Sequence, residues 1–156
     1  MDTSPRIALI DDDRAWLETL SDYLEAKGWL VHTAEGGLRG LELLARNEVA
    51  LVVVDFHMPD LDGLELIRQV RERGQNVRVL LLSSEEDPEL PARALAQGAA
   101  AFLSKNEAPA LFLKSLATIL ASLLLYPSSP DRFLPAPYRQ RSWLPVLSRN
   151  WPFSLN

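Results

Sequence analysis

The sequence predicts an α/β domain in which helices cover both faces of a five-stranded parallel sheet. Short apolar runs alternate five times with longer amphipathic stretches, as expected when each strand is followed by a crossover helix. The third apolar run, LVVV at 51–54, shows no polar alternation, which is typical of a strand buried on both faces. Polar side chains also gather where the apolar runs end, and parallel strands bring those ends to one edge of the sheet.

The elements follow one another in a regular order along the chain. We expect strands at residues 6–10, 29–33, 50–54, 77–82 and 100–103. We expect helices at residues 14–27, 38–47, 64–73, 88–97 and 108–125. The first helix is carried by apolar residues at helical spacing, namely Trp16, Leu17, Leu20, Tyr23 and Leu24.

Capping residues mark several helix boundaries. Asp13 is our choice for the N-cap of the first helix, because aspartate is favoured at that position. Asp62 and Gly63 form a turn that starts the third helix. Glycine closes the first, third and fourth helices, at Gly28, Gly74 and Gly98.

Length and composition favour one globular domain with an appendage. The chain has 156 residues, of which 47% are hydrophobic and 24% charged. It has no cysteine, which excludes disulfides and thiolate metal sites. A net charge of -5 argues against a chain built mainly to coat nucleic acid. The start lacks a secretory pattern, and the most apolar window, 111–126, is interrupted by Lys114, so we expect a cytoplasmic protein that does not enter the membrane.

The composition changes after residue 125, which predicts a domain at 1–125 and a tail at 126–156. The tail holds six of the chain's 11 prolines, and their spacing leaves no room for an ordinary helix. We therefore expect no second domain there.

Polar side chains, namely carboxylates, hydroxyls and one lysine, lie at the ends of four predicted strands. These residues are Asp11, Asp12, Asp13, Asp55, Ser83, Ser84, Ser104 and Lys105. Several carboxylates held close together need a compensating cation, and ligation by oxygen alone suits Mg²⁺, which usually also binds substrate phosphate. The cluster therefore predicts a magnesium-dependent phosphoryl site.

Four motifs carry a resemblance to a known family. They are IDDD at 10–13, VVVDFHMPDLDG at 52–63, LLLSSEE at 80–86 and GAAAFLSK at 98–105. In this order they make the chain, over about residues 5–125, similar to a bacterial two-component response-regulator receiver domain. The resemblance implies a flavodoxin-like sheet with strand order 2-1-3-4-5.

The resemblance also implies roles for the acidic residues. Asp55 matches the phosphoacceptor, which takes a phosphoryl group from a sensor histidine kinase or a phosphotransfer protein. Asp11 and Asp12 match the pair that holds Mg²⁺, together with Asp55 and the backbone carbonyl of His57. The protein would then be no turnover enzyme, with only self-phosphorylation from a donor and slow autodephosphorylation.

Three further matches imply a switch. Lys105 matches the lysine that pairs with phosphoryl oxygens, and Ser83 matches the hydroxyl that moves toward them. Phe102 matches an aromatic residue whose rotamer follows that hydroxyl, although a fixed core aromatic is an equally good interpretation. A new dianion offers Ser83 a charge-assisted hydrogen bond, so the face made by the fourth helix, fifth strand and fifth helix would be presented differently to partners.

Neighbouring residues have plainer interpretations. The two histidines are not spaced as a zinc pair, and we expect His32 at an edge or on the surface. His57 stands near the acceptor, and we name it with Glu85 as candidates for tuning the phosphoryl lifetime. Many receivers place proline after the lysine, where this chain has Asn106, so we expect a trans peptide bond there.

Receivers without that proline often precede a helix-turn-helix output domain, for which the tail has neither the length nor the periodicity. We therefore expect no direct DNA binding. Basic and aromatic residues in the tail suit contact with single-stranded nucleic acid less well than docking on its own domain or on a partner, with Trp143 and Trp151 as anchors. A remnant of an output domain is the remaining alternative.

The fifth helix ends in LLL at 123–125, more apolar surface than one buried stripe requires. Either the tail covers this surplus or a second copy of the chain does. The second case predicts a homodimer through the faces of the fourth and fifth helices.

Two other functions compete with the phosphoacceptor. One is a haloacid-dehalogenase-type phosphatase, because Asp11 to Asp13 also form an Asp-x-Asp motif after a strand. That interpretation explains Asp55 poorly and finds Ala15 where it expects threonine or valine. The other is a receiver-like interaction module that never binds phosphate, against which the intact set of site residues argues.

Overall fold

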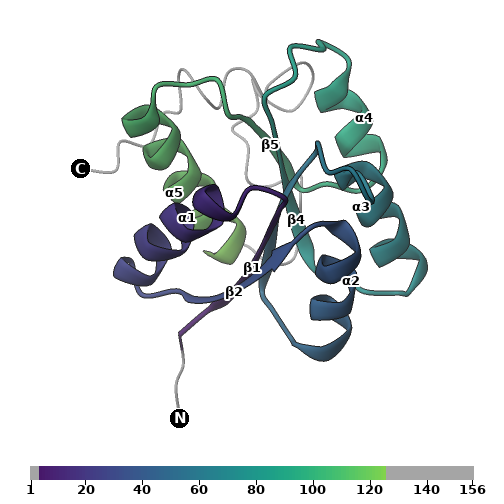
Figure 1. Cartoon of the computed structure of the whole chain (residues 1–156), viewed down its shortest axis with the longest axis horizontal. Coiled ribbons are helices and arrows are strands. Elements are labelled where there is room, and N and C mark those ends of the chain that lie inside the picture. The colour runs from purple at the N-terminus through teal and green to yellow at the C-terminus, as the bar shows by residue number, and fades with distance from the viewer. Residues whose placement is uncertain (1–3, 126–156) are drawn as a thin grey trace.

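The computed structural model describes residues 4–125, and the predicted tail at 126–156 lies outside the described residues. Its centre is a five-stranded parallel sheet in the order β2-β1-β3-β4-β5, which confirms the predicted class and strand order (Figure 1). The strands are β1 (Arg6–Asp11), β2 (Leu30–Glu35), β3 (Leu51–Asp55), β4 (Arg78–Ser83) and β5 (Ala101–Ser104).

Helices cover both faces of the sheet. They are α1 (Arg14–Ala26), α2 (Gly37–Arg46), α3 (Gly63–Glu72), α4 (Leu90–Ala96) and α5 (Pro109–Leu125). Helices α1 and α5 pack on one face, and α2, α3 and α4 pack on the other (Figure 1). The β1 side chains alternate between the two cores, with Ala8 and Ile10 on one face and Ile7 and Leu9 on the other.

The carboxyl ends of the central strands are held in place by burial and by pairing with neighbouring strands. Every residue of β3 is buried, as the unbroken LVVV run predicts, and β3 is paired on both sides. Its last residue, Asp55, stands opposite Leu82 of β4, and Asp11 ends β1 on the other side. Burying such apolar side chains stabilises the fold by roughly 1.5–3 kcal/mol each. Asp11 and Asp55 therefore lie at the ends of two central strands whose apolar residues are buried.

The helix ends use the predicted caps. The Asp13 carboxylate accepts from the Trp16 N–H at 3.2 Å, and the Asp62 carboxylate accepts from the Glu65 N–H at 2.8 Å. At the other end of α1, Gly28 has φ of 95° and its N–H donates to the Glu25 carbonyl. Because this conformation is left-handed, glycine is the residue that ends the helix without strain.

Element boundaries differ from the sequence prediction by at most two residues. Helix α4 begins at Leu90 instead of 88, because the Asp87 carboxylate accepts from the Glu89 N–H at 2.9 Å and holds a turn first. Strand β2 extends to Glu35, which pairs with Asp11. His32 lies in this edge strand, as expected. Among residues 4–125, no helix is both long enough and apolar enough to span a bilayer.

The apolar end of α5 is only partly within the described side chains. Leu123 is buried in the core beneath α1 and α5, whereas the side chains of Leu124 and Leu125 lie outside the described residues. Two large hydrophobic residues are exposed on the described part of the chain, Leu38 and Leu111. The predicted homodimer through α4 and α5 stays a prediction.

Candidate functional site

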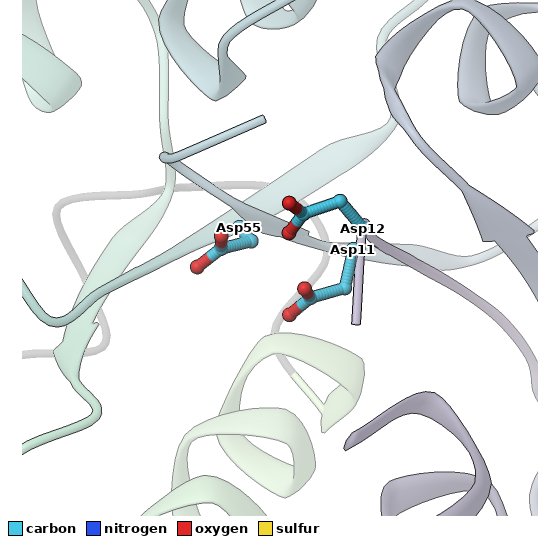
Figure 2. A group of neighbouring side chains, drawn as sticks. All are labelled: Asp11, Asp12 and Asp55. Carbon is cyan, nitrogen blue, oxygen red and sulfur yellow. The ribbon is translucent and has the colours of Figure 1, made fainter. Parts of the chain in front are cut away.

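Three carboxylates meet where β1 and β3 end. Asp11 and Asp12 leave β1 side by side and Asp55 faces them from β3 (Figure 2). Each can offer an oxygen atom such that all three oxygens lie within 4.8 Å of one another. Asp11 and Asp55 are 3% and 6% exposed, while Asp12 is open to solvent. The sheet therefore brings together the acidic residues that the sequence predicted would converge.

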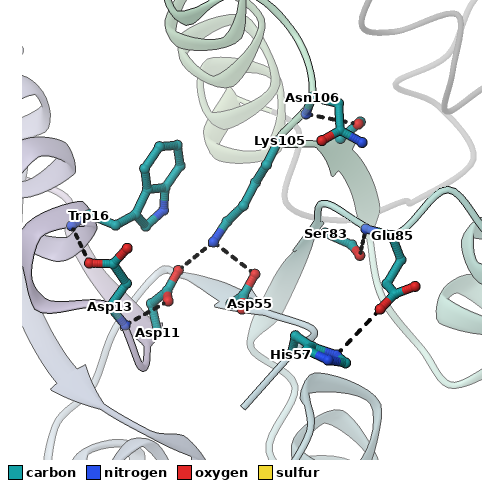
Figure 3. A network of polar contacts seen from close by, with 10 residues as sticks. Asp11, Asp13, Trp16, Asp55, His57, Ser83, Glu85, Lys105 and Asn106 are labelled. Atoms are coloured by element: carbon teal, nitrogen blue, oxygen red, sulfur yellow. Dashed lines mark hydrogen bonds and ion pairs between the residues drawn. The ribbon is translucent and has the colours of Figure 1, made fainter.

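Lys105 reaches this cluster from the end of β5. Its Nζ lies 2.7 Å from Asp11 Oδ2 and 2.9 Å from Asp55 Oδ1 (Figure 3). The side chain crosses the end of β4 to do so, since β4 lies between β3 and β5. One ammonium group thus bridges two buried carboxylates from different strands.

Burial and the Lys105 ammonium shift the pKa of Asp11 and Asp55 in opposite directions. Burial raises the pKa of Asp11 to about 6, even though hydrogen bonds from Lys105 and from the Asp13 N–H favour the ionised form. Burial likewise raises the pKa of Asp55 against the same lysine. For Lys105, burial alone would lower the pKa, but the two carboxylates together raise it above its ordinary value. One lysine thus leaves the acidic cluster short of positive charge.

The donor set fits a hard divalent cation. Only oxygen ligands are offered, and the exposed Asp12 leaves an approach from solvent. The main-chain N–H of His57 donates to the Asp55 carboxylate, so the chain at His57 lies against the site. A cation there would supply the charge that Lys105 does not. The cluster could therefore hold a hard divalent cation.

Ser83 lies beside the cluster at the end of β4. It is 1% exposed, and its Oγ accepts a hydrogen bond from the Glu85 N–H at 2.9 Å (Figure 3). The neighbouring Ser84 is exposed, and its carbonyl accepts from the Asn106 side chain at 2.9 Å. Asn106 is joined to Lys105 by a trans bond, as predicted, since the described residues contain no cis peptide.

The remaining predicted residues occupy two environments. Phe102 is 5% exposed and packs within the core beneath α2, α3 and α4. His57 and Glu85 meet at the surface, with 3.6 Å between Nδ1 and Oε1, and the His57 side chain is 76% exposed (Figure 3). The two residues named for lifetime tuning therefore belong to one contact between the loops after β3 and β4.

The structure shows two contacts that sequence reasoning did not predict, one at the site and one at the start of α2. The Trp16 ring lies with its centroid 4.8 Å from Lys105 Nζ, although its spacing marked it only as part of a helical face. Its position three residues after the Asp13 cap was the available signal, because the first turn of α1 stands at the acidic edge. Asp60 accepts from the N–H groups of Gly37 and Leu38 on α2, a contact to which no sequence signal pointed.

Known proteins resemble this chain in both sequence and fold. A model of the response regulator receiver domain matches residues 7–117. The response regulator MprA of Mycobacterium sp. strain KMS is 38% identical over 126 residues, which cover 81% of this chain and 53% of that protein. MprA of Mycobacterium leprae strain TN is 37% identical over the same coverage. The chain spans about half the length of the curated relatives it matches.

The fold also matches solved structures of response regulators. The receiver domain of Francisella response regulator 1452 has a TM-score of 0.74 at 25% identity and covers 80% of this chain and 100% of its own. The chemotaxis response regulator CheY4 of Vibrio cholerae has a TM-score of 0.68 at 28% identity, covering 75% and 99%. The response regulator TrrA of Thermotoga maritima, solved in complex with Mg²⁺-BeF, has a TM-score of 0.68 at 25% identity, covering 77% and 99%.

The strand order is that of the CheY-like, flavodoxin-like class of α/β domains. The chain belongs to the response-regulator receiver domain family of two-component systems.

Proposed function

We propose that Asp55 is the phosphoacceptor of this receiver and that a sensor histidine kinase or a phosphotransfer protein supplies the phosphoryl group. The observation that carries the proposal is the Asp55 carboxylate itself, buried at the end of a fully paired strand and held 2.9 Å from Lys105 Nζ. A nucleophile on a rigid mount beside a cation suits phosphoryl transfer, which depends mainly on positioning and charge neutralisation.

In the proposed transfer, one bond to phosphorus forms while another breaks. A carboxylate oxygen of Asp55 forms a bond to phosphorus while the bond from phosphorus to the donor's imidazole nitrogen breaks. The leaving imidazole keeps the electron pair and takes a proton from solvent, and Asp55 becomes an acyl phosphate. Lys105 is placed to pair with a phosphoryl oxygen, since its ammonium already contacts Asp55. The exchange would occur in the cytoplasm, where kinase and receiver meet.

The residues that would hold Mg²⁺ are Asp11, Asp12 and Asp55, with the backbone carbonyl of His57. When bound, the ion neutralises negative charge on the phosphoryl oxygens. The Mg²⁺-BeF complex of the related TrrA supports this assignment by analogy. Asp12 would offer its carboxylate from the solvent side, and Asp11 and Asp55 would offer buried carboxylates that also contact Lys105.

Phosphorylation would be relayed through Ser83. Its hydroxyl now accepts from the Glu85 N–H, and turning toward a phosphoryl group would give up that bond. The loop after β4 would then rearrange, together with the α4, β5 and α5 face next to it. We propose this face as the surface read by a protein partner. A rotamer change of Phe102 belongs to the same proposal, although its packing suits a fixed core residue equally well.

Intact mass tests the proposal. The full chain is incubated with Mg²⁺ and acetyl phosphate, with Asp55→Asn as the matched variant. We expect the wild type to gain one phosphoryl group and the variant to gain none, and we expect chelation of Mg²⁺ to abolish the gain. A gain that survives in Asp55→Asn would place the acceptor elsewhere. No gain in either protein, with Mg²⁺ binding confirmed, would favour the phosphate-independent interaction module.

The lifetime of the acyl phosphate depends, in this proposal, on the contact between His57 and Glu85. Their side chains meet between the loops that follow Asp55 and Ser83, and we propose that this pair slows the approach of water to Asp55. We expect His57→Ala to shorten the lifetime by a factor of a few, measured as the decay of phosphorylated mass after removal of the donor. Asp22→Ala, an exposed change on α1, serves as control. An unchanged decay in His57→Ala would remove this role.

A further inference from the structure

Lys105 has a third neighbour besides its two carboxylates. Its Nζ lies 4.8 Å from the centroid of the Trp16 ring, within the range of a cation–π interaction (Figure 3). The two carboxylate contacts use two directions around the ammonium, and the aromatic face occupies another. The site lysine is only 16% exposed as a result of being enclosed in this way.

The Trp16 ring is itself fixed from two helices. It lies in the first turn of α1, where its main-chain N–H donates to Asp13. On its other side it packs against Phe112 of α5, with ring centroids 5.2 Å apart and planes tilted by 55°. Phe112 is 2% exposed, so this support belongs to the core. A ring held by a helix cap and a core aromatic is a rigid wall for Lys105.

The contacts of Lys105 differ in what happens to them during the proposed reaction. Asp55 is the group that would be phosphorylated, and Asp11 would share its negative charge with a bound metal. The attraction of each carboxylate for the ammonium would therefore change during the reaction. Trp16 is neither a reacting group nor a metal ligand, and its ring face offers the cation the same attraction before and after transfer.

We propose that Trp16 is a positioning residue that holds the Lys105 ammonium in the site while its carboxylate partners change. A long lysine side chain has many rotamers, and this rotamer entropy favours its release to solvent once a carboxylate contact weakens. The aromatic wall opposes that release. The inference rests on the proposed function, because it assigns a role within phosphoryl transfer to Asp55.

The first test measures the contact in the metal-free protein. Free energies of unfolding are determined for Trp16→Leu, Lys105→Met and the double variant. We expect the two changes to be non-additive, with a coupling of about threefold to thirtyfold in the unfolding equilibrium constant, the range of a cation–π contact. Additive effects would overturn the inference whatever the protein does with phosphate.

The second test measures phosphorylation by acetyl phosphate at saturating Mg²⁺, so that a change in metal affinity does not enter. We expect Trp16→Leu to slow phosphoryl uptake about threefold to thirtyfold, and Trp16→Phe, which keeps an aromatic face, to fall between leucine and tryptophan. In the Lys105→Met background we expect the substitution at Trp16 to have no further effect. Trp29→Leu is the matched control, because Trp29 is also half-buried against the same core but lies in the turn just before β2.

The outcomes separate the two proposals. A phosphorylated wild type whose rate is unchanged in Trp16→Leu, or a leucine variant as fast as the phenylalanine variant, overturns the role of Trp16 alone. A wild type that takes up no phosphoryl group overturns the proposed function and the positioning role with it. A rate that falls equally in Trp29→Leu shows a general loss of packing and also overturns the inference.

Discussion

Asp11 combines a buried position with a proposed metal-binding role that requires its negative charge. Its carboxylate is 3% exposed, and burial raises its pKa to about 6. The folded chain therefore holds the Asp11 proton more tightly than the unfolded chain, where the ordinary value is 3.8. The contribution of this group to stability is present below pH 3.8 and is lost as pH rises through about 6.

This titration predicts how metal binding depends on pH. A protonated Asp11 cannot ligate a cation, so we expect the affinity for Mg²⁺ to fall as pH is lowered through about 6. Well below that value the affinity should weaken by about tenfold per pH unit for this single proton. Calorimetric titration of the metal-free protein with Mg²⁺ between pH 5 and 8 measures it. An affinity that does not change over this interval would contradict the raised pKa.

The acidic edge could be predicted from sequence, while some of its neighbours could not. Asp11, Asp55 and Lys105 converge because parallel strands end on one side, which the apolar runs already indicate. The contact between Trp16 and Lys105 could not be predicted, because an aromatic residue at the spacing of a buried helix face is usually a core residue. The role of Trp16 at the site depends on how α1 packs against α5, and that packing is a tertiary contact which the sequence does not state.

At the scale of elements, the N-terminus of α2 is capped by a residue from the loop after β3. Gly36 precedes the helix and has no side chain to cap it, and the Asp60 carboxylate accepts from the N–H groups of Gly37 at 3.1 Å and Leu38 at 3.0 Å instead. A Cβ on Gly37 would stand 2.5 Å from the Leu61 carbonyl, so the loop lies directly on the helix end. These partners are 22 and 23 positions from Asp60, too far for any local capping motif to indicate.

Removal of this cap should destabilise the domain. We expect Asp60→Ala to lower the free energy of unfolding by about 1 kcal/mol at pH 7, the usual cost of losing an N-cap. The Leu38 N–H is the main group that holds the pKa of Asp60 below its ordinary value. The stabilisation is therefore present above pH 3.8 and is lost as pH falls below it. Urea denaturation at pH 7 and pH 3 checks both statements, and an equal cost at the two pH values would contradict them.

A second link between elements is made by Arg71 of α3. Its guanidinium donates to the carbonyls of Gln75 at 2.8 Å, Val77 at 2.7 Å and Gly98 at 2.9 Å. These bonds join the end of α3 to the start of β4 and to the turn before β5. The arrangement uses the planar fork of arginine, and the three acceptors lie on main-chain segments whose positions only the fold defines.

Loss of this link should cost more than loss of a surface charge. We expect Arg71→Leu to lower the free energy of unfolding by about 3 kcal/mol, because main-chain carbonyls lose a charged donor. Arg73→Leu, two positions along on an exposed residue, should change it by less than about 0.5 kcal/mol. Chemical denaturation of the two variants makes the comparison. Equal effects would show that the Arg71 contacts contribute little.

At the scale of the whole molecule, the described residues contain both layers of core. One cluster lies between the sheet and α2, α3 and α4, and the other lies between the sheet and α1 and α5. We expect a chain ending at Leu125 to unfold cooperatively and to take up phosphate from acetyl phosphate at the wild-type rate. Thermal unfolding and intact mass of the two chains test this. A large drop in midpoint would show that residues 126–156 complete the fold.

The Lys105 contacts also have a consequence for how the chain is made. The hydrogen bond from Lys105 to Asp11 joins residues 94 positions apart, across the ends of all the strands between them. Asp11 and Asp55 are both synthesised before Lys105, so these acids lack the lysine as a counter-ion until β5 has docked on β4. A partly synthesised or partly folded chain therefore lacks a finished acceptor. Under the proposed function, the site could accept a phosphoryl group only after β5 has docked, and phosphorylation would select for molecules whose folding is complete.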